Sequence, residues 1–487
     1  MRVLLVRPPV PALTIGLKHV MCCEPLELEY AAAGLAGHEV RILDLLLERG
    51  LEEVLRAWRP DVVGTSAYVT GVGEAKKVCR TAKALRPGCA TVVGGVHAAM
   101  APEDFADPAV DCVALGDGTT QLPEIVAALE AGRPLDEVPG LALLRGGRTV
   151  RTAPRAYLPV HPDALPLPRR DLVRHLRHRY YYVFHQPLAL VKTSWGCPYR
   201  CSFCVPWRVT GGEVFSRSPA SIADELAGLD CEDVYVVDDL FLTHPARLAE
   251  LARLLRARGI RKRYLVYGRA DFIAANEPIV AEWAALGLSA VLVGLEAVTD
   301  AELSSLAKRT TVDQNRRAIE VLRRNGVDVF GSLAPRPDYR PEDWERLWRF
   351  VDETGLVYLN VSPLTPLPGT DLWEAEARHL TVPRRAHALF DLSHCLLPTR
   401  MPLRDYYRAL LRTYARACLR PLRTRRLAAR PLPPVWSRRS LRLWWGALRV
   451  WLQLRRAHRH HEPALLARAL DPGPAPPGGE GTDAARG

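Results

Sequence analysis

Residues 195–204 read WGCPYRCSFC and place Cys197, Cys201 and Cys204 at C-x3-C-x2-C spacing, directly after the apolar run LALVKTSW (188–195). Three thiolates in eight residues suit an iron–sulfur cluster, and the absence of a fourth cysteine nearby leaves one iron open to an external ligand. Zinc is the main competitor, with His185 as a candidate fourth ligand, and coincidental spacing is the remaining alternative. The motif favours a [4Fe–4S] cluster.

Strands and helices alternate on both sides of this motif. Residues 1–145 hold five apolar strand candidates separated by helical stretches, which predicts a doubly wound (Rossmann-like) parallel sheet. Residues 188–382 hold six more, which predicts a partial (β/α)6 barrel. The candidates are 2–6, 38–46, 61–68, 89–95 and 110–118, then 188–195, 233–239, 263–269, 290–296, 327–333 and 357–364. The expected fold class is α/β, with two successive sheet domains.

The other segments differ in composition. Residues 146–187 read as a linker, residues 383–470 as a helical region rich in Arg and Leu, and the Pro/Gly-rich residues 471–487 as a disordered tail. Residues 396–470 contain 18 Arg and Lys against two acids, a charge of +16, and the rest contains 48 against 52, a charge of −4. The basic character is therefore C-terminal. A near-neutral body without an RNA-binding module argues against nucleic acid as a partner.

The sequence also limits the compartment. No apolar run approaches the ~20 residues needed to cross a bilayer. Pro8 and Pro9 interrupt the N-terminal apolar run too early for a signal peptide. The cysteines outside the motif are mostly scattered singly, as buried thiols are, and do not suggest a disulfide framework. We expect a cytoplasmic protein.

The strand ends of the first sheet carry glycines and small polar residues. They read Gly64-Thr65-Ser66, Gly94-Gly95-Val96-His97 and Gly116-Asp117-Gly118, and Thr70 follows the first of them. Ligands of such sheets bind beyond the carboxyl ends of the strands, and glycine lets a bulky ligand approach the backbone. The alternative is that these residues serve the fold alone, as glycines in turns and serines in strands.

The cysteine motif resembles the signature of the radical S-adenosylmethionine (radical SAM) enzymes, C-x3-C-x-aromatic-C after a strand. The resemblance continues through VVDDLF, YGRADF, GLEAVTDAELSSLAKRTT and PLTPLPGTDLW. It implies that SAM chelates the free iron and is cleaved to a 5′-deoxyadenosyl radical. It also implies that Phe203 packs the adenine and that Asp239, Arg269 and Glu296 contact SAM. For Arg269 and Glu296 a barrel salt bridge is the alternative. The loop Ala334-Pro335-Arg336-Pro337 departs from the small residues usual there.

A doubly wound domain ahead of a radical SAM core resembles the cobalamin-binding subclass. This resemblance implies that Ser66, Thr70, Gly94, Gly95, His97 and Gly116 line a cobalamin site. The D-x-H-x-x-G motif that supplies an axial histidine is absent, so we expect base-off cobalamin, with His97 anchoring a loop rather than binding cobalt. Such a pairing of cofactors implies methyl transfer to an unactivated carbon, with a reducing donor such as flavodoxin or ferredoxin.

The substrate is suggested by the C-terminal region and by a further resemblance. Along WSRRSLRLWWGALRVWLQLRR (436–456), Leu441, Trp444, Trp445, Leu448, Trp451 and Leu452 share one helical face, and Arg438, Arg442, Arg449 and Arg456 line another. This pattern suits a membrane interface, here the inner face of the cytoplasmic membrane, or a helix that caps the barrel. Three stretches, LLVRPPVPALTIGLKHVMCCEPLELEYAAAGL (4–35), HLRHRYYYVFHQPLAL (175–190) and LFDLSHCLLPTRMPLRDYYRALLRTYAR (389–416), resemble the hopanoid C-3 methylases. This resemblance spans nearly the whole chain and implies a pentacyclic triterpenoid lipid substrate methylated on ring A.

Other functions stay open at this point. They are a methylase of a peptide or another natural-product intermediate, a cobalamin-dependent cyclase that adds no methyl group, and a non-catalytic cobalamin-binding regulator. The regulator would not need the intact cysteine motif.

Overall fold

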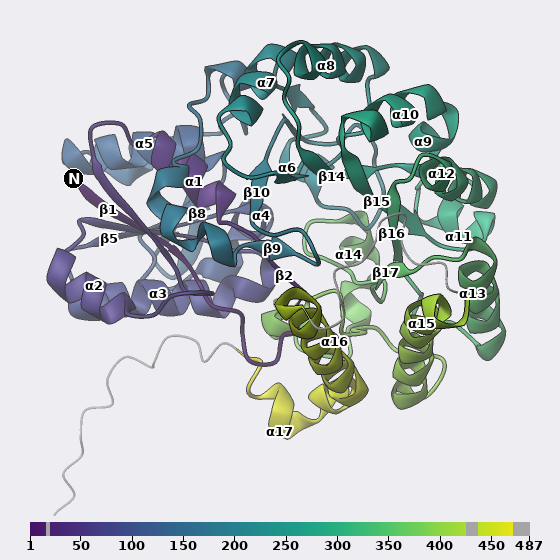
Figure 1. The fold of residues 1–487 in the computed structure, drawn as a ribbon. Helices are drawn as coiled ribbons and strands as arrows, with labels where there is room; N and C mark the ends of the chain where they lie inside the picture. Colours follow the sequence, from purple (N-terminus) through teal and green to yellow (C-terminus); the bar gives the residue numbers. More distant parts are fainter. Residues whose placement is uncertain (16–19, 425–436, 471–487) are drawn as a thin grey trace, which may run out of the picture.

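The first sheet has seven strands, five of them parallel (Figure 1). The computed structural model describes residues 1–15, 20–424 and 437–470, so the predicted tail 471–487 and Trp436 lie outside the described residues. The strand order is β3-β1-β4-β5-β6-β7-β8, with bounds Glu39–Asp44, Arg2–Arg7, Val62–Ser66, Ala90–Gly94, Cys112–Ala114, Leu141–Arg145 and Arg148–Arg151. The last two strands are antiparallel.

Helices cover both faces of this sheet, as a doubly wound fold requires. Helices α1 (Leu26–Ala33) and α5 (Gly118–Glu130) share one core with the sheet, and α2 (Leu51–Trp58) and α3 (Val72–Leu85) share another. The hairpin β7–β8 was not expected, and its second strand falls in the segment predicted to be linker. Its turn, Gly146-Gly147, has positive φ at both glycines, the geometry of a tight hairpin.

The second sheet contains the six expected strands, all parallel and in chain order. They are β10 (Leu188–Val191), β13 (Asp233–Val236), β14 (Arg263–Gly268), β15 (Leu288–Glu296), β16 (Asp328–Leu333) and β17 (Tyr358–Val361). Alternate residues such as Val236, Val266 and Val291 join the large core formed with the outer helices. Those helices are α7 (Pro219–Ala227), α8 (Pro245–Ala257), α10 (Glu277–Leu286), α12 (Val312–Arg324) and α13 (Pro341–Thr354).

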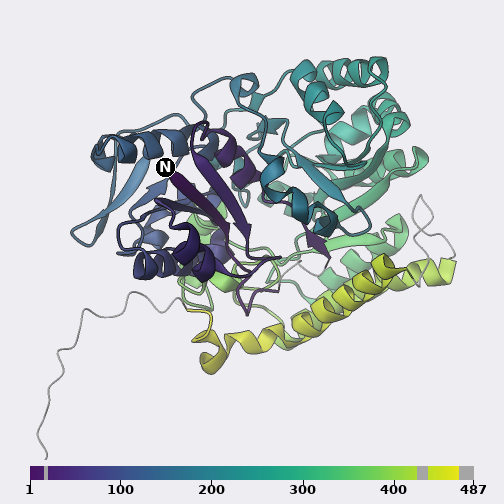
Figure 2. The same cartoon turned by 60° about the vertical axis from the view of Figure 1, so that its left-hand side comes forward.

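The C-terminal region adds two long helices at the periphery of the molecule (Figure 2). Helix α15 (Leu403–Thr424) packs on α13 and β17, and α16 (Arg438–Arg456) packs on α15. The α-helix begins at Leu403, later than the sequence suggested, because Pro383, Pro398 and Pro402 interrupt the preceding segment. None of the described helices is long and apolar enough to span a bilayer.

The segment before α15 instead docks on the first domain. Its 3-10 turn η8 (His387–Leu389) contacts the turn η2 (Val69–Gly71) that follows β4. Thr14 Oγ1 donates a hydrogen bond to the Ala388 carbonyl (2.8 Å), and the Ile15 amide donates to Asp391 Oδ2 (2.6 Å). The C-terminal region therefore packs against both sheet domains.

A buried cation joins the two domains directly. Arg170, at the start of the turn segment η6 (Arg170–Arg179), donates to Glu24 Oε1 and to Glu225 Oε1, each at 2.6 Å. It also donates to the Leu190 carbonyl in β10 at 2.6 Å. Glu24 belongs to the first domain and Glu225 to α7 of the second, and both side chains are almost fully buried. Burial disfavours the charge on Arg170, but Glu24 and Glu225 outweigh it and raise the pKa.

The joined domains present the carboxyl ends of their strands to each other. Helix α4 (Val96–Met100), which follows β5 of the first sheet, contacts α6 (Pro206–Val209), which follows the cysteine motif. The strand-end residues expected to bind ligands in the two sheets therefore lie on facing edges.

We predict that Arg170→Ala destabilises the protein by about 3–5 kcal/mol, because it leaves buried carboxylates without their cation. Arg169→Ala is the matched control, since Arg169 pairs with Asp171 in an exposed ion pair that is worth at most about 1 kcal/mol. Chemical denaturation of the three proteins measures the difference. Equal midpoints for the two variants would show that Arg170 does not hold the domains.

Candidate functional site between the two sheets

A tight loop carries the three cysteines between β11 (Ser194–Trp195) and α6. It begins at Gly196, whose φ is +85° and where a Cβ atom would lie 2.1 Å from the Glu213 carbonyl oxygen. Only glycine fits such a position. The Trp207 indole donates to the Cys201 carbonyl (3.2 Å), and the Cys204 amide donates to the same oxygen (3.2 Å). The loop is thus shaped by the chain itself.

Two acidic side chains after β13 hold the start of this loop. Asp238 accepts hydrogen bonds from the amides of Thr193 (2.6 Å) and Ser194 (3.0 Å) and from their hydroxyls. Asp239, predicted to contact SAM, accepts from the Gly196 amide (2.8 Å) and lies 3.8 Å from Lys192 Nζ. Asp239 therefore positions the cysteine loop.

The three thiols fit a cluster by their chemistry. Burial, together with the neighbouring Cys201 and Cys197, raises the pKa of Cys204 to about 12, although Lys308 acts in the opposite direction. Thiols this close disfavour one another's ionisation, and a cationic cluster is what lets all three be thiolates together. His185 binds Asp233 at the opposite end of β13 (2.8 Å), which removes it as a fourth zinc ligand.

The predicted SAM residues Arg269 and Glu296 lie beside the cysteine loop but do not pair with each other. The Arg269 guanidinium stacks over the Tyr199 ring, 3.5 Å from its centroid, and donates to the Lys308 carbonyl (2.7 Å). Glu296 accepts from Lys308 Nζ at 2.8 Å. Glu296 also sits at a bulge in β15 with φ +60°, a costly conformation for a non-glycine residue that concentrates at binding sites. Both residues thus form the salt bridges that were the alternative, Glu296 with Lys308 and Arg269 with Asp271 (3.0 Å).

Phe203 packs against the start of the loop Ala334–Pro337, which follows β16, the fifth strand of the second sheet. Its ring lies against a small cluster of Leu306, Ala334 and Leu364. The Ser202 amide donates to the Leu306 carbonyl (3.1 Å). Phe203 therefore belongs to one apolar cluster with Ala334, the residue that Pro335, Arg336 and Pro337 follow.

The strand-end glycines of the first domain are not equivalent. Ser66 and Gly94 are register partners across β4 and β5. A Cβ atom at Gly94 would meet only Ala114, at 3.9 Å, whereas one at Gly95 (φ +102°) would lie 2.7 Å from Ser66 Oγ. At Gly116 the nearest atoms are those of Gln121 and Arg155. Gly94 therefore leaves room for a ligand, Gly95 is required by the chain's own packing, and Gly116 is closely surrounded by side chains of the first domain.

Tyr68, which the sequence reasoning missed, lies two residues beyond β4 near the half-buried Thr70. Its side chain is 67% exposed. Desolvation raises the pKa of its hydroxyl, and so do the nearby charges of Glu27 in the first domain and of Tyr267 and Asp239 in the second. Ionisable groups of both domains therefore lie around this exposed side chain.

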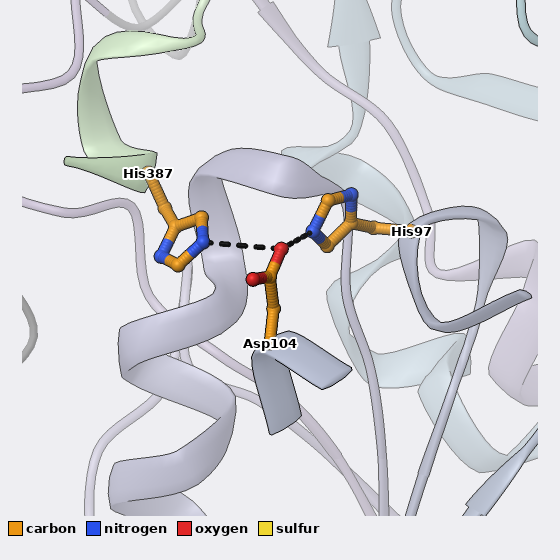
Figure 3. A group of neighbouring side chains, drawn as sticks. All are labelled: His97, Asp104 and His387. Atoms are coloured by element: carbon orange, nitrogen blue, oxygen red, sulfur yellow. Dashed lines mark hydrogen bonds and ion pairs between the residues drawn. The ribbon is translucent and has the colours of Figure 1, made fainter. Parts of the chain in front are cut away.

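His97 is anchored within the protein (Figure 3). Its Nε2 lies 2.8 Å from Asp104 Oδ2, and His387 Nε2 lies 3.2 Å from the same oxygen. Burial favours the neutral acid, but the hydrogen bonds from His387 and His97 outweigh it and lower the pKa of Asp104 well below its usual range. The trio ties the loop after β5 to η8, as expected for a loop anchor.

Two protein families match separate parts of the chain. The B12 binding domain matches residues 13–126, and the radical SAM superfamily matches residues 191–354. The chain is 34% identical over 400 residues to the hopanoid C-3 methylase of Methylococcus capsulatus, an alignment that covers 80% of this chain and 75% of that protein. It is 26% identical over 343 residues to the anaerobic magnesium-protoporphyrin IX monomethyl ester cyclase of Rubrivivax gelatinosus, covering 68% of this chain and 60% of that enzyme.

The fold also recurs in a solved structure. The radical SAM methyltransferase TsrM from Kitasatospora setae, with tryptophan and a SAM analogue bound, superposes with a TM-score of 0.67 at 20% identity. The match covers 96% of this chain and 99% of that one. Both sheets and the C-terminal helical region therefore belong to one shared architecture.

We predict that Cys201→Ala abolishes binding of about four irons per chain after anaerobic reconstitution, because two thiolates do not retain such a cluster. Cys231→Ala is the matched control, since Cys231 is a buried thiol that precedes β13 at the opposite end from the cysteine loop. Iron content and visible absorbance measure the outcome. Full iron retention by the Cys201 variant would contradict the assignment.

We predict that Gly94→Leu blocks cobalamin uptake while the protein still folds, because the added side chain enters the open space beyond β5. Gly88→Leu, at a position with no neighbouring atoms within 4 Å, is the control. The readout is cobalamin absorbance that co-elutes with the protein. If a folded Gly94 variant binds cobalamin like wild type, the site lies elsewhere.

Proposed function

Because the chain belongs to the cobalamin-dependent radical SAM methyltransferases, we propose that it methylates an unactivated carbon of a hopanoid lipid, at C-3. The observation that carries the substrate is the likeness to the hopanoid C-3 methylase, which extends over four fifths of this chain and includes both cofactor domains. A relationship of this length supports a shared substrate class as well as a shared chemistry.

The chain's own residues divide into two half-sites. Cys197, Cys201 and Cys204 would hold the cluster, with Phe203, Arg269, Glu296 and Lys308 around SAM. Ser66, Thr70 and Gly94 would border cobalamin. When bound, the cluster and SAM supply hydrogen abstraction, and cobalamin supplies the methyl group. The protein positions the two half-sites on facing edges and screens the space between them. A reducing protein such as flavodoxin or ferredoxin would deliver the electron.

The inner face of the barrel supports a flat, apolar substrate. Five rings from five strands form a row along it: Tyr182 of β9 (Tyr181–Tyr182), Tyr235, Tyr267, Phe330 and Tyr358. Phe330 and Tyr358 stack with centroids 4.5 Å apart, and Tyr267 is 38% exposed. Such rings bury large apolar area against a rigid polycyclic ligand.

The outer face of α16 supports a membrane-bound substrate. Leu441, Trp444, Trp445, Leu448, Trp451 and Leu452 are all exposed, between 39% and 60%. The opposite side of the helix packs on the protein through Ser440, Leu454 and Ala457. Arg442, which the sequence placed on the arginine face of the helix, stacks over Tyr181 at 3.6 Å and donates to Gln186. The helix therefore caps the body of the protein and offers its tryptophan face outward. We infer peripheral binding at the inner face of the cytoplasmic membrane.

The function is tested by lipid profiling of a hopanoid-producing strain that lacks C-3 methylation, with and without this gene. We predict hopanoids heavier by one CH2 unit, methylated at C-3, and no such product with the Cys201→Ala chain. A hopanoid product without added mass would instead support cyclisation, the reaction named for the Rubrivivax gelatinosus relative. No change in hopanoids would support a peptide or other natural-product substrate.

Vesicle co-sedimentation tests the membrane face. Trp444→Ala/Trp445→Ala/Trp451→Ala should release the protein from anionic liposomes at high salt, because burial of three indoles supplies the salt-insensitive part of binding. The control replaces three exposed apolar residues elsewhere, Val150, Val160 and Leu167, with Ala. Equal pelleting of both variants would assign the tryptophan face a purely structural role.

A further inference from the structure

A basic groove runs between α15 and α16, beside the tryptophan face. It has a volume of about 690 Å³. Six arginines line it, which we call the arginine groove: Arg404, Arg408, Arg412, Arg455, Arg456 and Arg459. The first three recur at every fourth residue and so share one face of α15.

The positive charge in the arginine groove is largely uncompensated. Arg408 pairs with Asp405 at 2.8 Å. Within the described part of the chain, the other five arginines of the groove have no carboxylate partner. Burial together with Arg459 and Arg404 lowers the pKa of the adjacent His458. Six cations kept in one groove repel each other, so the arrangement suits an anionic ligand.

The groove is also half apolar and continuous with the tryptophan face. Trp451 and Leu452 line the groove and belong to the exposed apolar face of α16. Leu411 and Ala415 of α15 contribute to the opposite wall. An anion seated among the arginines would therefore lie directly beside an apolar surface, as the phosphate of a phospholipid lies beside its acyl chains.

We propose that the arginine groove binds the phosphate head group of an anionic phospholipid. This inference rests on the membrane association proposed above and identifies the lipid chemistry that orients the enzyme on the bilayer. The planar guanidinium matches phosphate oxygens in a bidentate manner, which favours arginine over lysine for this task. An acidic protein or a nucleic acid would be attracted by the same positive charge but would not bury the adjoining apolar wall as an acyl chain does.

The test compares vesicles of phosphatidylcholine with vesicles that also contain phosphatidylglycerol. The groove variant is Arg404→Gln/Arg455→Gln/Arg459→Gln. The control, Arg49→Gln/Arg133→Gln/Arg148→Gln, removes the same charge from exposed positions on the first domain. A basic residue near an anionic surface contributes about fivefold to partitioning. We therefore expect the groove variant to lose roughly tenfold to hundredfold in partitioning to phosphatidylglycerol vesicles only. The control should stay within about threefold of wild type.

A second measurement separates this proposal from membrane association in general. Titration with dihexanoyl phosphatidylglycerol below its micelle concentration should saturate wild type and the tryptophan variant Trp444→Ala/Trp445→Ala, but not the groove variant. Equal losses in the groove and control variants would overturn the site in favour of diffuse charge. Unchanged lipid binding by the groove variant, with lost binding of flavodoxin or RNA, would reassign the groove to that partner. Wild type that binds vesicles but not the short-chain lipid would also overturn it.

Discussion

The pairing of Arg170 with carboxylates from two domains is the constraint on which the site depends. A buried guanidinium is costly unless its donors are satisfied, and here the acceptors are Glu24 of the first domain, Glu225 of the second and a carbonyl of β10. Any rotation of one sheet against the other would leave buried charges unpaired. Both carboxylates have a second cation, since Arg177 also binds Glu24 and Arg217, within the second domain, also binds Glu225. These buried ion pairs therefore fix the position of one sheet relative to the other.

Within each half-site, too, side chains of the protein fix the backbone around the site. Asp238 and Asp239 fix the cysteine loop through the amides of residues 193, 194 and 196, and Gly196 supplies the backbone turn. On the other sheet, Gly95 lets α4 turn back against Ser66, and His97, Asp104 and His387 hold that turn to the C-terminal segment. These groups fix the backbone on which the predicted ligand contacts depend, and such support keeps a site rigid.

Much of this architecture could be predicted from the sequence, because hydrophobic runs and the cysteine spacing are local signals. Every strand expected in either sheet is present, and the cysteines follow the first strand of the barrel. The hairpin β7–β8 was missed although Gly146-Gly147 marks its turn. The prolines before Leu403 delay the start of α15, although the composition of the segment predicted a helix. Other features have no local signal. The stacking of Arg269 on Tyr199, the pairing of Lys308 with Glu296 and the inward turn of Arg442 join residues that only the folded chain brings together.

The proposed function requires two cofactor half-sites, held face to face, to transfer a methyl group to a carbon of a polycyclic lipid. The most direct test incubates anaerobically reconstituted protein with hopanoid, a reductant and SAM whose S-methyl group is deuterated. The account predicts a hopanoid that gains one deuterated methyl group, formed together with 5′-deoxyadenosine and only in the presence of cobalamin. Formation of 5′-deoxyadenosine with a hopanoid that carries no deuterium would contradict it.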